Sequence, residues 1–254
     1  MSTLDLSNKI ILITGGAGAI GRVVIQTLLT HGATIAANDI ISAEEADLVL
    51  PRSEKLLYFC ADTTKPDEVK DMLNKIESKL GMPNVVCCHA GMVAAHPITD
   101  YPLDEYDRLM EVNVRAAFVV AQETVRRWIA QGVSGHLIFT TSWVQDVPWP
   151  EITPYTMSKS AMKMMMRGFA RELADKGIRA NAIAPGIVSV GLAKHQWDTD
   201  PSYRARAARA IPLGYMQPPE SVAHAFVFLC SDMASYMTGA TLLIDGGCSL
   251  YPMD

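Results

Sequence analysis

Short runs of apolar residues alternate with amphipathic stretches from one end of the chain to the other. The apolar runs have the length of strands and are hydrophobic at almost every position, which is typical of strands buried on both faces of a parallel sheet. The pattern therefore predicts strands at 9–14, 33–38, 55–60, 84–89, 135–141, 179–184 and 241–244.

Between these runs, apolar residues recur at helical spacing, and we expect helices near 19–31, 66–80, 103–131, 154–176 and 219–231. Gly32 follows the first helix as a C-terminal stop, and Pro66 and Pro219 fit the first turns of theirs. Strands that alternate with helices in this way predict an α/β protein, with a doubly wound parallel sheet, helices on both faces and right-handed crossovers.

The segment 187–218 breaks this rhythm, because it is polar, lacks a clear period and is bounded by Pro185-Gly186 and Pro218-Pro219. It falls between the last two predicted strands, on the side where such sheets bind ligands. We therefore interpret it as an irregular substrate loop or lid. No linker-like tract or repeat divides the chain elsewhere, so we expect one domain over residues 1–254.

The composition narrows the class of protein. The chain of 254 residues is 49% hydrophobic and 19% charged, which is ordinary for a soluble globular protein. A net charge of -5 and the lack of a basic patch argue against binding to nucleic acid or to an anionic membrane. The first residues are polar and show no secretory signal, and no apolar run approaches the ~20 residues that span a bilayer. We expect a cytoplasmic protein.

Five cysteines are present without the spacing of a metal site, since the sequence has no C-x-x-C and no alternation of cysteine with histidine. They lie in or beside apolar runs, which indicates small buried side chains in a reducing compartment. We expect no bound metal.

A glycine-rich turn directly follows the first predicted strand. Gly16, Gly18 and Gly21 have the G-x-G-x-x-G spacing of a dinucleotide-binding turn, and the chain then enters a predicted helix. Glycines allow a tight turn in which backbone N–H groups approach a pyrophosphate at the positive end of the helix. The residues expected to contact the cofactor in this turn are Gly15, Gly18, Ala19, Ile20 and Gly21.

Asp39, at the end of the second predicted strand, bears on the choice of cofactor. It follows the glycine turn by about 20 residues, a spacing at which a carboxylate hydrogen-bonds the hydroxyls of the adenosine ribose. The same charge repels a 2′-phosphate, and neither the turn nor positions 38–41 carry an arginine or lysine. We expect NAD rather than NADP. The alternative, a plain tight turn with Asp39 capping a strand, explains less, because strand, turn, helix and acid occur together.

Tyr155 and Lys159 open a predicted helix four residues apart, so their side chains share one helical face. A free tyrosine has a pKa of roughly 10, and a neighbouring ammonium lowers that pKa toward the range that proton transfer needs. Ser142 ends a predicted strand, where its hydroxyl can hold the substrate oxygen that Tyr155 protonates or deprotonates. A Y-x-x-x-K spacing alone is common by chance, and its weight here comes from the dinucleotide-binding half that precedes it.

Together these motifs resemble the short-chain dehydrogenase/reductase family over essentially the whole chain. The matching positions, in family order, are 14–21, Asp62, Ala90-Gly91, Asn113, Ser142, Tyr155, Lys159 and Pro185-Gly186. The resemblance implies a Rossmann-type parallel sheet of seven strands, a homotetramer, and an oxidoreductase with a nicotinamide cofactor.

The same resemblance implies roles for individual residues. Tyr155 would be the general acid/base, Lys159 a ribose ligand that lowers the pKa of Tyr155, and Ser142 the holder of the substrate oxygen. Asn113 would support a proton-relay water, and Asp62 would contact the adenine. Pro185 and Gly186 would line the nicotinamide, and Ala90, Gly91 and Val188 complete the expected cofactor contacts.

The chain departs from the family pattern in two places. Ala19 stands at the middle glycine of the turn, a replacement that keeps the G-x-G-x-x-G spacing. Cys88 and His89 stand where the family usually has two asparagines. We interpret His89 as a structural, hydrogen-bonded histidine in preference to a catalytic one.

Segments 147–150, 211–215 and 245–252 bear on the substrate, because they look like the glucose 1-dehydrogenase branch of the family. That similarity suggests an aldose oxidised at its anomeric carbon to a lactone, or another polyol. Val93 and Val144, however, stand where that branch often has polar residues, which predicts a less polar pocket. The side chains expected to line the pocket are Val93, Trp143, Val144, Gln145, Trp149 and His195.

Other functions stay open. A reductase of ketones, including 3-oxoacyl thioesters, would use the same catalytic residues. A non-catalytic NAD-binding sensor would use the same fold, but it has no need of Ser142, Tyr155 and Lys159 together. Arginines at 204, 206 and 209 could bind an anionic substituent of the substrate, although a solvated helix face is the favoured interpretation.

Overall fold

Seven parallel strands form one sheet in the computed structural model, which describes residues 4–250. The strands are β1 (Ile10–Thr14), β2 (Thr34–Asp39), β3 (Leu56–Cys60), β4 (Val85–Cys88), β5 (Gly135–Thr140), β6 (Ile178–Pro185) and β7 (Thr241–Ile244). Their spatial order is β3-β2-β1-β4-β5-β6-β7, so the direction of winding reverses between β1 and β4. A ligand crevice forms at such a reversal, outside the carboxyl ends of the strands. The predicted doubly wound parallel sheet is confirmed.

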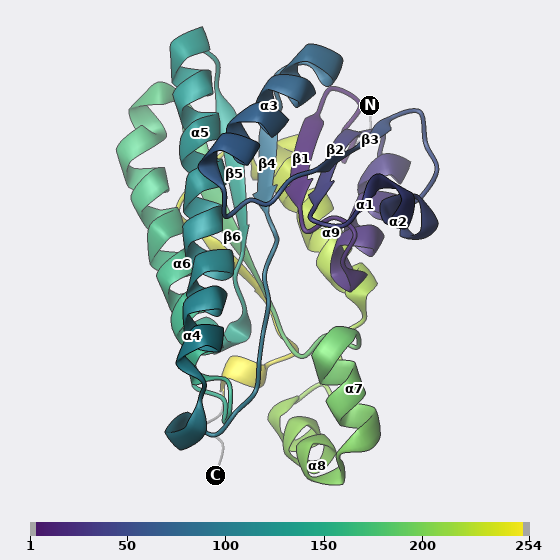
Figure 1. Cartoon of the computed structure of the whole chain (residues 1–254), viewed down its shortest axis with the longest axis vertical. Coiled ribbons are helices and arrows are strands. Elements are labelled where there is room, and N and C mark those ends of the chain that lie inside the picture. Colours follow the sequence, from purple (N-terminus) through teal and green to yellow (C-terminus); the bar gives the residue numbers. More distant parts are fainter. Residues whose placement is uncertain (1–3, 251–254) are drawn as a thin grey trace.

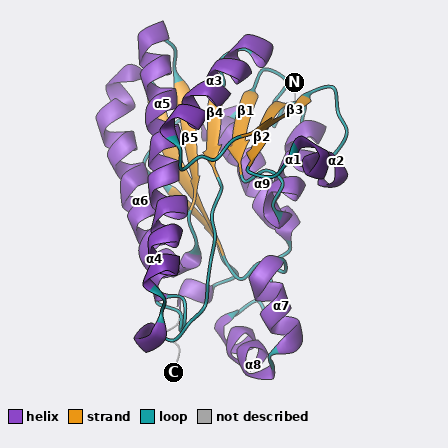
Figure 2. Ribbon diagram, viewed as in Figure 1, coloured by secondary structure: helices purple, strands orange, loops and turns teal. Residues whose placement is uncertain are grey.

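Helices cover both faces of this sheet, as Figures 1 and 2 show. Leu12 of β1 packs into the core under one set of helices, and the next residue, Ile13, packs into the core on the other face. The first set is α3 (Pro66–Leu80), α5 (Ala116–Gln131) and α6 (Thr153–Leu173); the second is α1 (Ala19–Thr30) and α9 (Pro219–Cys230). Burial of both faces explains why the strands are apolar at nearly every position.

The helix expected over 103–131 is interrupted in the structure. After α4 (Leu103–Met110), a π-helical turn at Glu111–Arg115 precedes α5. Turns of this kind are rare and frequently lie at functional sites, and this one carries Asn113, which is fully buried. A short helix that the apolar pattern did not predict, α2 (Ala43–Val49), buries only Ala46 and begins at a capping box.

The 187–218 segment is more regular than the sequence predicted, and its role as a substrate loop or lid stays a prediction. It contains α7 (Gly191–Thr199) and α8 (Pro201–Ala210), drawn in green at the lower right of Figure 1. The Asp200 carboxylate caps α8 by accepting two backbone N–H groups of its first turn. The apolar pattern missed these helices because few of their residues are buried: none in α7 and three in α8.

The two ends of this segment lie side by side. Val188 pairs with Gln217 in an isolated parallel bridge, and the Gln217 N–H donates to the carbonyl of Ile187 at 2.8 Å. The Gln217 side-chain oxygen also accepts the backbone N–H of Gly186 at 2.7 Å. The chain therefore leaves the end of β6 and returns to it at a single point.

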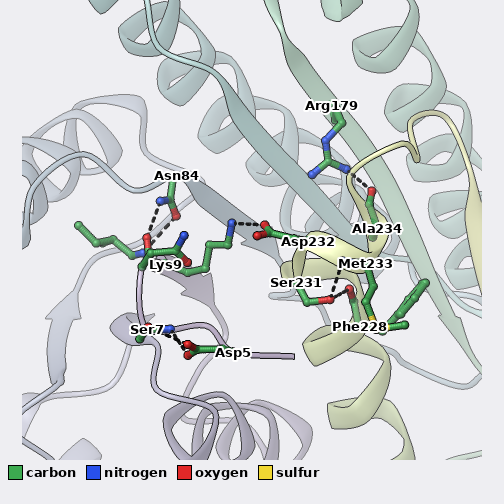
Figure 3. A network of polar contacts seen from close by, with 12 residues as sticks. Asp5, Ser7, Lys9, Asn84, Arg179, Phe228, Ser231, Asp232, Met233 and Ala234 are labelled. Atoms are coloured by element: carbon green, nitrogen blue, oxygen red, sulfur yellow. Dashed lines mark hydrogen bonds and ion pairs between the residues drawn. The ribbon is translucent and has the colours of Figure 1, made fainter. Parts of the chain in front are cut away.

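The amino ends of the strands are tied together by polar contacts, drawn in Figure 3. Lys9, just before β1, contacts Asp232 after α9 at 2.9 Å, and the Asn84 side chain accepts the Ile10 N–H at 3.1 Å. Arg179, early in β6, donates to the carbonyl of Ala234 at 2.8 Å. These contacts fix the amino ends of the strands, which lie at the opposite end of the sheet from the ligand crevice.

Residues 4–250 contain no helix with the length and apolar character that a bilayer crossing requires.

Candidate active site

The glycine turn links β1 to α1 in a close-packed arrangement. Gly15 has a left-handed φ of 70°, and a Cβ there would lie 2.8 Å from the Cα of Ala90. A Cβ on Gly21 would lie 2.3 Å from the carbonyl oxygen of Gly15. Both positions therefore require glycine for packing, and the turn presents its backbone at the start of a helix, where a phosphate binds.

A cleft of about 530 Å³ opens at the carboxyl ends of the strands, beside this turn. Of the residues predicted to contact the cofactor, Gly21 alone does not line the cleft, since it supports the turn from inside. Those that line it are Gly15, Gly18, Ala19, Ile20, Asp39, Asp62, Ala90, Gly91, Tyr155, Lys159, Pro185, Gly186 and Val188. An elongated set of contacts that begins at a glycine turn fits a dinucleotide.

Asp39 stands at the end of β2 beside the glycine turn. One carboxylate oxygen accepts the Ala17 N–H at 3.0 Å, and the other accepts the Ile40 N–H at 2.8 Å. Among the described residues that line the cleft, only Arg108 and Lys159 are cationic. Arg108 pairs with Glu111 at 3.1 Å, and Lys159 donates to the Thr140 carbonyl.

Asp62 lines the same cleft as Asp39. Burial alone would raise the pKa of its carboxyl, but hydrogen bonds from the Thr64 hydroxyl and backbone N–H outweigh burial and lower that pKa. Asp62 is therefore a charged acceptor at neutral pH. Within residues 4–250, no group of three or more His, Cys, Asp or Glu side chains is arranged to hold a metal ion.

Tyr155 and Lys159 lie one turn apart on α6, and the Lys159 Nζ is 5.4 Å from the centre of the Tyr155 ring. Nζ donates to the Thr140 carbonyl at the end of β5, at 2.8 Å. Within residues 4–250 this ammonium forms no ion pair with a carboxylate, and burial lowers the pKa of Lys159 to about 8.

The pKa of Tyr155 runs opposite to the direction expected from Lys159. Burial raises it to about 12, and the hydrogen bond with Ser142 opposes that rise only in part. The Lys159 ammonium is directed at the Thr140 carbonyl, and burial dominates the pKa of Tyr155. In this arrangement Tyr155 is a neutral phenol, able to donate a proton.

Ser142 follows β5 directly and is 7% exposed. It begins a short 3₁₀ turn, Trp143–Gln145, and its hydroxyl is the nearest acceptor for the Val144 N–H, at 3.5 Å. That long contact is weak, and the Ser142 hydroxyl also hydrogen-bonds the Tyr155 side chain. Ser142 and Tyr155 thus place two hydroxyls at one point of the cleft.

The side-chain amide of Asn113 forms hydrogen bonds with other groups of the protein. Its amide nitrogen donates to the Met92 carbonyl at 2.9 Å and to the Ser158 hydroxyl at 3.0 Å, and its oxygen accepts the Met92 N–H at 2.8 Å. A Cβ on Gly91 would come within 3.2 Å of this amide. Asn113 holds the loop after β4 in place, and its role beside a relay water stays a prediction.

His89 contacts structural groups, as predicted for a hydrogen-bonded histidine. Its Nδ1 lies 3.0 Å from the Thr140 hydroxyl, and its ring meets Phe226 edge-on at 5.8 Å between centroids. Burial, with a smaller contribution from the charge of Lys159, lowers the pKa of His89 to about 4. The imidazole is neutral at physiological pH and holds the ends of β4 and β5 together.

A second cavity of about 210 Å³ adjoins the cleft, and Ser142 and Tyr155 line both. Of the predicted substrate contacts, Val93, Trp143, Val144 and Trp149 line this cavity. Gln145 and His195 lie outside this lining, and their contact with a substrate stays a prediction.

The positions of Gln145 and His195 are explained by local geometry. Gln145 ends the 3₁₀ turn, and its carbonyl accepts the Ser160 hydroxyl at 2.6 Å. His195 faces outward on α7, and the next residue, Gln196, lines the cavity instead. The lining residues that the sequence analysis missed are Ile152, Ile187, Val190, Leu192, Ala193 and Tyr203. Most belong to the 187–218 segment, whose position in the chain was the available signal.

Aromatic rings form one side of this cavity. Trp143 meets Trp149 edge-on with 5.2 Å between centroids, and Trp149 meets Tyr203 of α8 at 6.2 Å. Arg206, which lines neither cavity, stacks 5.3 Å from the Trp149 ring and contacts Glu151 at 3.5 Å. This guanidinium fastens α8 to the rings, and its position does not favour a role in binding an anionic substrate.

Known proteins resemble the chain over nearly its full length. A family profile described as enoyl-(acyl carrier protein) reductase matches residues 15–249. The 3beta-hydroxysteroid dehydrogenase 1 of Eggerthella lenta is 31% identical over 252 residues, which is 98% of this chain and 96% of that protein. The glucose 1-dehydrogenase of Gluconobacter oxydans is 30% identical over 253 residues, covering 96% of this chain and 93% of that protein.

Solved structures resemble the chain as well. The crystal structure of a short-chain type dehydrogenase/reductase from Mycobacterium marinum superposes with a TM-score of 0.88 at 33% identity and covers 98% of both chains. With the glycine turn, Ser142, Tyr155 and Lys159 in the crevice of the sheet, this similarity identifies the chain as a member of the short-chain dehydrogenase/reductase family.

Proposed function

We propose that the protein is an NAD-dependent oxidoreductase that exchanges a hydride between a carbinol carbon of its substrate and the nicotinamide. The observation that carries this proposal is the position of Ser142 and Tyr155, which line both the dinucleotide-shaped cleft and the smaller cavity beside it. A substrate in the smaller cavity would have its oxygen at these hydroxyls and its carbon facing the cleft.

The chain's own residues handle the proton. When bound, the cofactor supplies or accepts the hydride. In reduction, the neutral phenol of Tyr155 donates its proton to the substrate oxygen while the Ser142 hydroxyl holds that oxygen. In oxidation, Tyr155 must first lose its proton to act as the base. Since burial raises the pKa of Tyr155 to about 12, oxidation should accelerate as the pH rises.

Replacement of Tyr155 by phenylalanine tests this assignment. The variant keeps the ring but lacks the hydroxyl, so turnover should fall by about 10²–10⁴-fold while NADH binding, followed by the fluorescence of the reduced cofactor, stays. Tyr58→Phe is the control, because the Tyr58 hydroxyl donates to the Ile41 carbonyl outside the cleft. Wild-type turnover in Tyr155→Phe would refute the proton-transfer role.

The choice of NAD rests on Asp39. Its carboxylate lies beside the glycine turn, where it would accept the ribose hydroxyls of NAD and repel the 2′-phosphate of NADP. Asp39→Ala should narrow the preference for NAD over NADP by tenfold or more, on the order of one lost charged hydrogen bond. Asp47→Ala, on the exposed surface of α2, should leave the preference unchanged. Undiminished discrimination in Asp39→Ala would contradict the assignment.

A homotetramer in the cytoplasm remains part of the proposal. The outer surfaces of α5 and α6 carry exposed apolar side chains, among them Phe118 at 42% and Met164 at 64%, whereas Met162 and Met166 of α6 are buried in the core. An exposed apolar surface of this kind supports association between copies. Analytical ultracentrifugation would measure the state of assembly.

The catalytic residues serve sugar oxidation, ketone reduction and 3-oxoacyl reduction equally well, and the named relatives include both a steroid and a glucose dehydrogenase. A protein that binds NADH tightly but turns over no alcohol or ketone would instead be a sensor. The walls of the smaller cavity therefore decide which class of substrate the protein accepts.

A further inference from the structure

Most of the residues that line the 210 Å³ cavity have apolar side chains. Aliphatic side chains approach from three parts of the chain: the loop after β4, the loop after β5, and the 187–218 segment. They include Val93, Val144, Ile152, Ile187, Val190 and Leu192. None of the described residues that line the cavity is charged. A wall of this composition stabilises apolar surface and offers little to a hydroxyl group.

The polar groups in the cavity are few. Ser142 and Tyr155 are engaged by the reacting oxygen in the proposed chemistry. The remaining polar side chains are Gln196, the phenol of Tyr203 and the indole N–H groups of the two tryptophans. A hexose or an inositol would bring several further hydroxyls, each of which needs a partner when it leaves water. The cavity supplies too few partners for them.

The aromatic side of the cavity is held in place from behind. Trp149 is 5% exposed and lies between Trp143 and Tyr203, with the Arg206 guanidinium against its ring. Residues packed on several sides keep one position, so this wall is a preformed surface for a ring. The cavity, at about 210 Å³, is smaller than the roughly 300–1,000 Å³ that hold drug-sized ligands.

We infer that the substrate is a compact apolar ring alcohol of one or two rings, or the corresponding ketone, and that the enzyme rejects sugars. This inference rests on the proposed dehydrogenase function. The substrate oxygen would lie at Ser142 and Tyr155, and the hydrocarbon rings would pack between the aliphatic walls and Trp149. The Val144 and Val93 positions, which a sugar-binding pocket would fill with polar groups, here complete the apolar wall.

Matched pairs of substrates test the inference with the wild-type enzyme. Cyclohexanol and inositol share a six-membered carbon ring and differ in the number of hydroxyls. Decalin-2-ol adds a second ring, 1-phenylethanol an aromatic one, and a 3β-hydroxysteroid tests size. Each alcohol is assayed with NAD, and each matching ketone with NADH, by the absorbance of the reduced cofactor. We expect kcat/KM for the one- and two-ring alcohols to exceed that for inositol and glucose by at least 100-fold, since each unpaired hydroxyl costs about tenfold.

The outcomes separate the inference from the function on which it rests. Turnover of glucose or inositol at rates equal to or above those of the ring alcohols would overturn the inference and leave the dehydrogenase function intact. A steroid preferred over both smaller classes would overturn the size limit. Silence toward every alcohol and ketone, with NADH still bound, would overturn the proposed function itself and the inference with it.

Two variants place the selectivity in the cavity wall. Trp149→Ala should raise KM for cyclohexanol and decalin-2-ol by about tenfold, because one side of the ring site is lost. Trp197→Ala is the matched control: Trp197 is a half-buried tryptophan of α7 that packs against the same cluster without lining the cavity. Equal effects of both substitutions would show that Trp149 acts through folding alone.

Val144→Thr avoids any loss of volume and therefore tests the wall even where Trp149→Ala folds poorly. It keeps the shape of the side chain and adds one hydroxyl to the cavity. We expect kcat/KM for cyclohexanol to fall and that for inositol to rise. A constant ratio of the two would contradict an apolar wall that selects the substrate.

Discussion

Lys159 carries a buried positive charge. Removal of this charge should relieve a destabilisation of the folded protein and lower its turnover. The perturbation is Lys159→Met, which keeps the length of the side chain. In the folded protein the pKa of Lys159 is lowered to about 8 from an ordinary 10.5. A folded protein that holds its ammonium this weakly is destabilised at pH 7 by about 3 kcal/mol relative to one without the charge. The variant also leaves the Thr140 carbonyl without its 2.8 Å donor, which costs about 1–3 kcal/mol.

The pH dependence isolates the charge from the lost hydrogen bond. Between pH 8 and 10.5 the unfolded chain holds a proton on Lys159 that the folded protein has released, so the stability of the wild type rises with pH in this window. The destabilisation falls to about 1.4 kcal/mol at pH 9.5. The difference in unfolding free energy, variant minus wild type, should therefore decrease by about 2 kcal/mol between pH 7 and pH 9.5, whatever constant offset the Thr140 carbonyl adds.

Urea unfolding at both pH values, followed by tryptophan fluorescence at one protein concentration, measures this difference. Lys163→Met is the control, because Lys163 lies one turn further along α6 and pairs at the surface with Asp146 at 2.7 Å. It should give a difference that does not change with pH in the same way. A pH-independent difference for Lys159→Met would show that burial does not destabilise the ammonium. Turnover of the variant should fall sharply at both pH values.

Two further predictions concern the framework. Gly21→Ala should weaken NADH binding at least tenfold and destabilise the fold, because the new Cβ would lie 2.3 Å from the Gly15 carbonyl oxygen. Gly168→Ala, with no atom within 4 Å of its Cβ, should instead stabilise α6 by up to about 1 kcal/mol. Fluorescence titration of NADH and thermal unfolding distinguish the two variants, and normal NADH binding in Gly21→Ala would contradict the close packing of the turn. Burial lowers the pKa of His136 to about 3. As the pH falls below about 6.5, the unfolded chain therefore takes up a proton on His136 before the folded protein does. The free energy of unfolding of the wild type should fall by about 3 kcal/mol by pH 4.5 through this group. His136→Gln should flatten this part of the stability profile in urea titrations, and an unchanged slope would exclude His136 as its source.

The strands and the cofactor turn were predictable because their physical requirements are local. A strand buried on both faces must be apolar at nearly every position, and the close approach of Gly15 to Ala90 admits no side chain. The side chains at the ends of β2 and β5, Asp39 and Ser142, follow from the strand pattern alone. Tyr155 and Lys159 could be placed together for the same reason, since a helix fixes the direction of residues four apart.

The substrate cavity was less predictable because it depends on the rotation of short helices. In α7 the sequence offers His195 and Gln196 as neighbours, and only the packing of the helix decides that Gln196 faces the cavity. Gln145 lies outside the cavity lining because the 3₁₀ turn after Ser142 directs Val144 inward. The pKa of Tyr155 was misjudged in direction because the spacing of residues reveals the nearby charge of Lys159 but not the degree of burial, which dominates.

The bridge between Val188 and Gln217 has a consequence for how such an enzyme changes its substrate. Everything between these two residues, α7 and α8 included, enters and leaves the sheet at one anchored point, while Ser142, Tyr155 and Lys159 belong to β5, α6 and the loop between them. The 189–216 segment can thus be replaced as one unit. Evolution or an engineer can replace its sequence, and with it the far wall of the cavity, while β5 and α6 keep Ser142, Tyr155 and Lys159 in place. Divergence of substrate within one scaffold then requires no compromise in the chemistry itself.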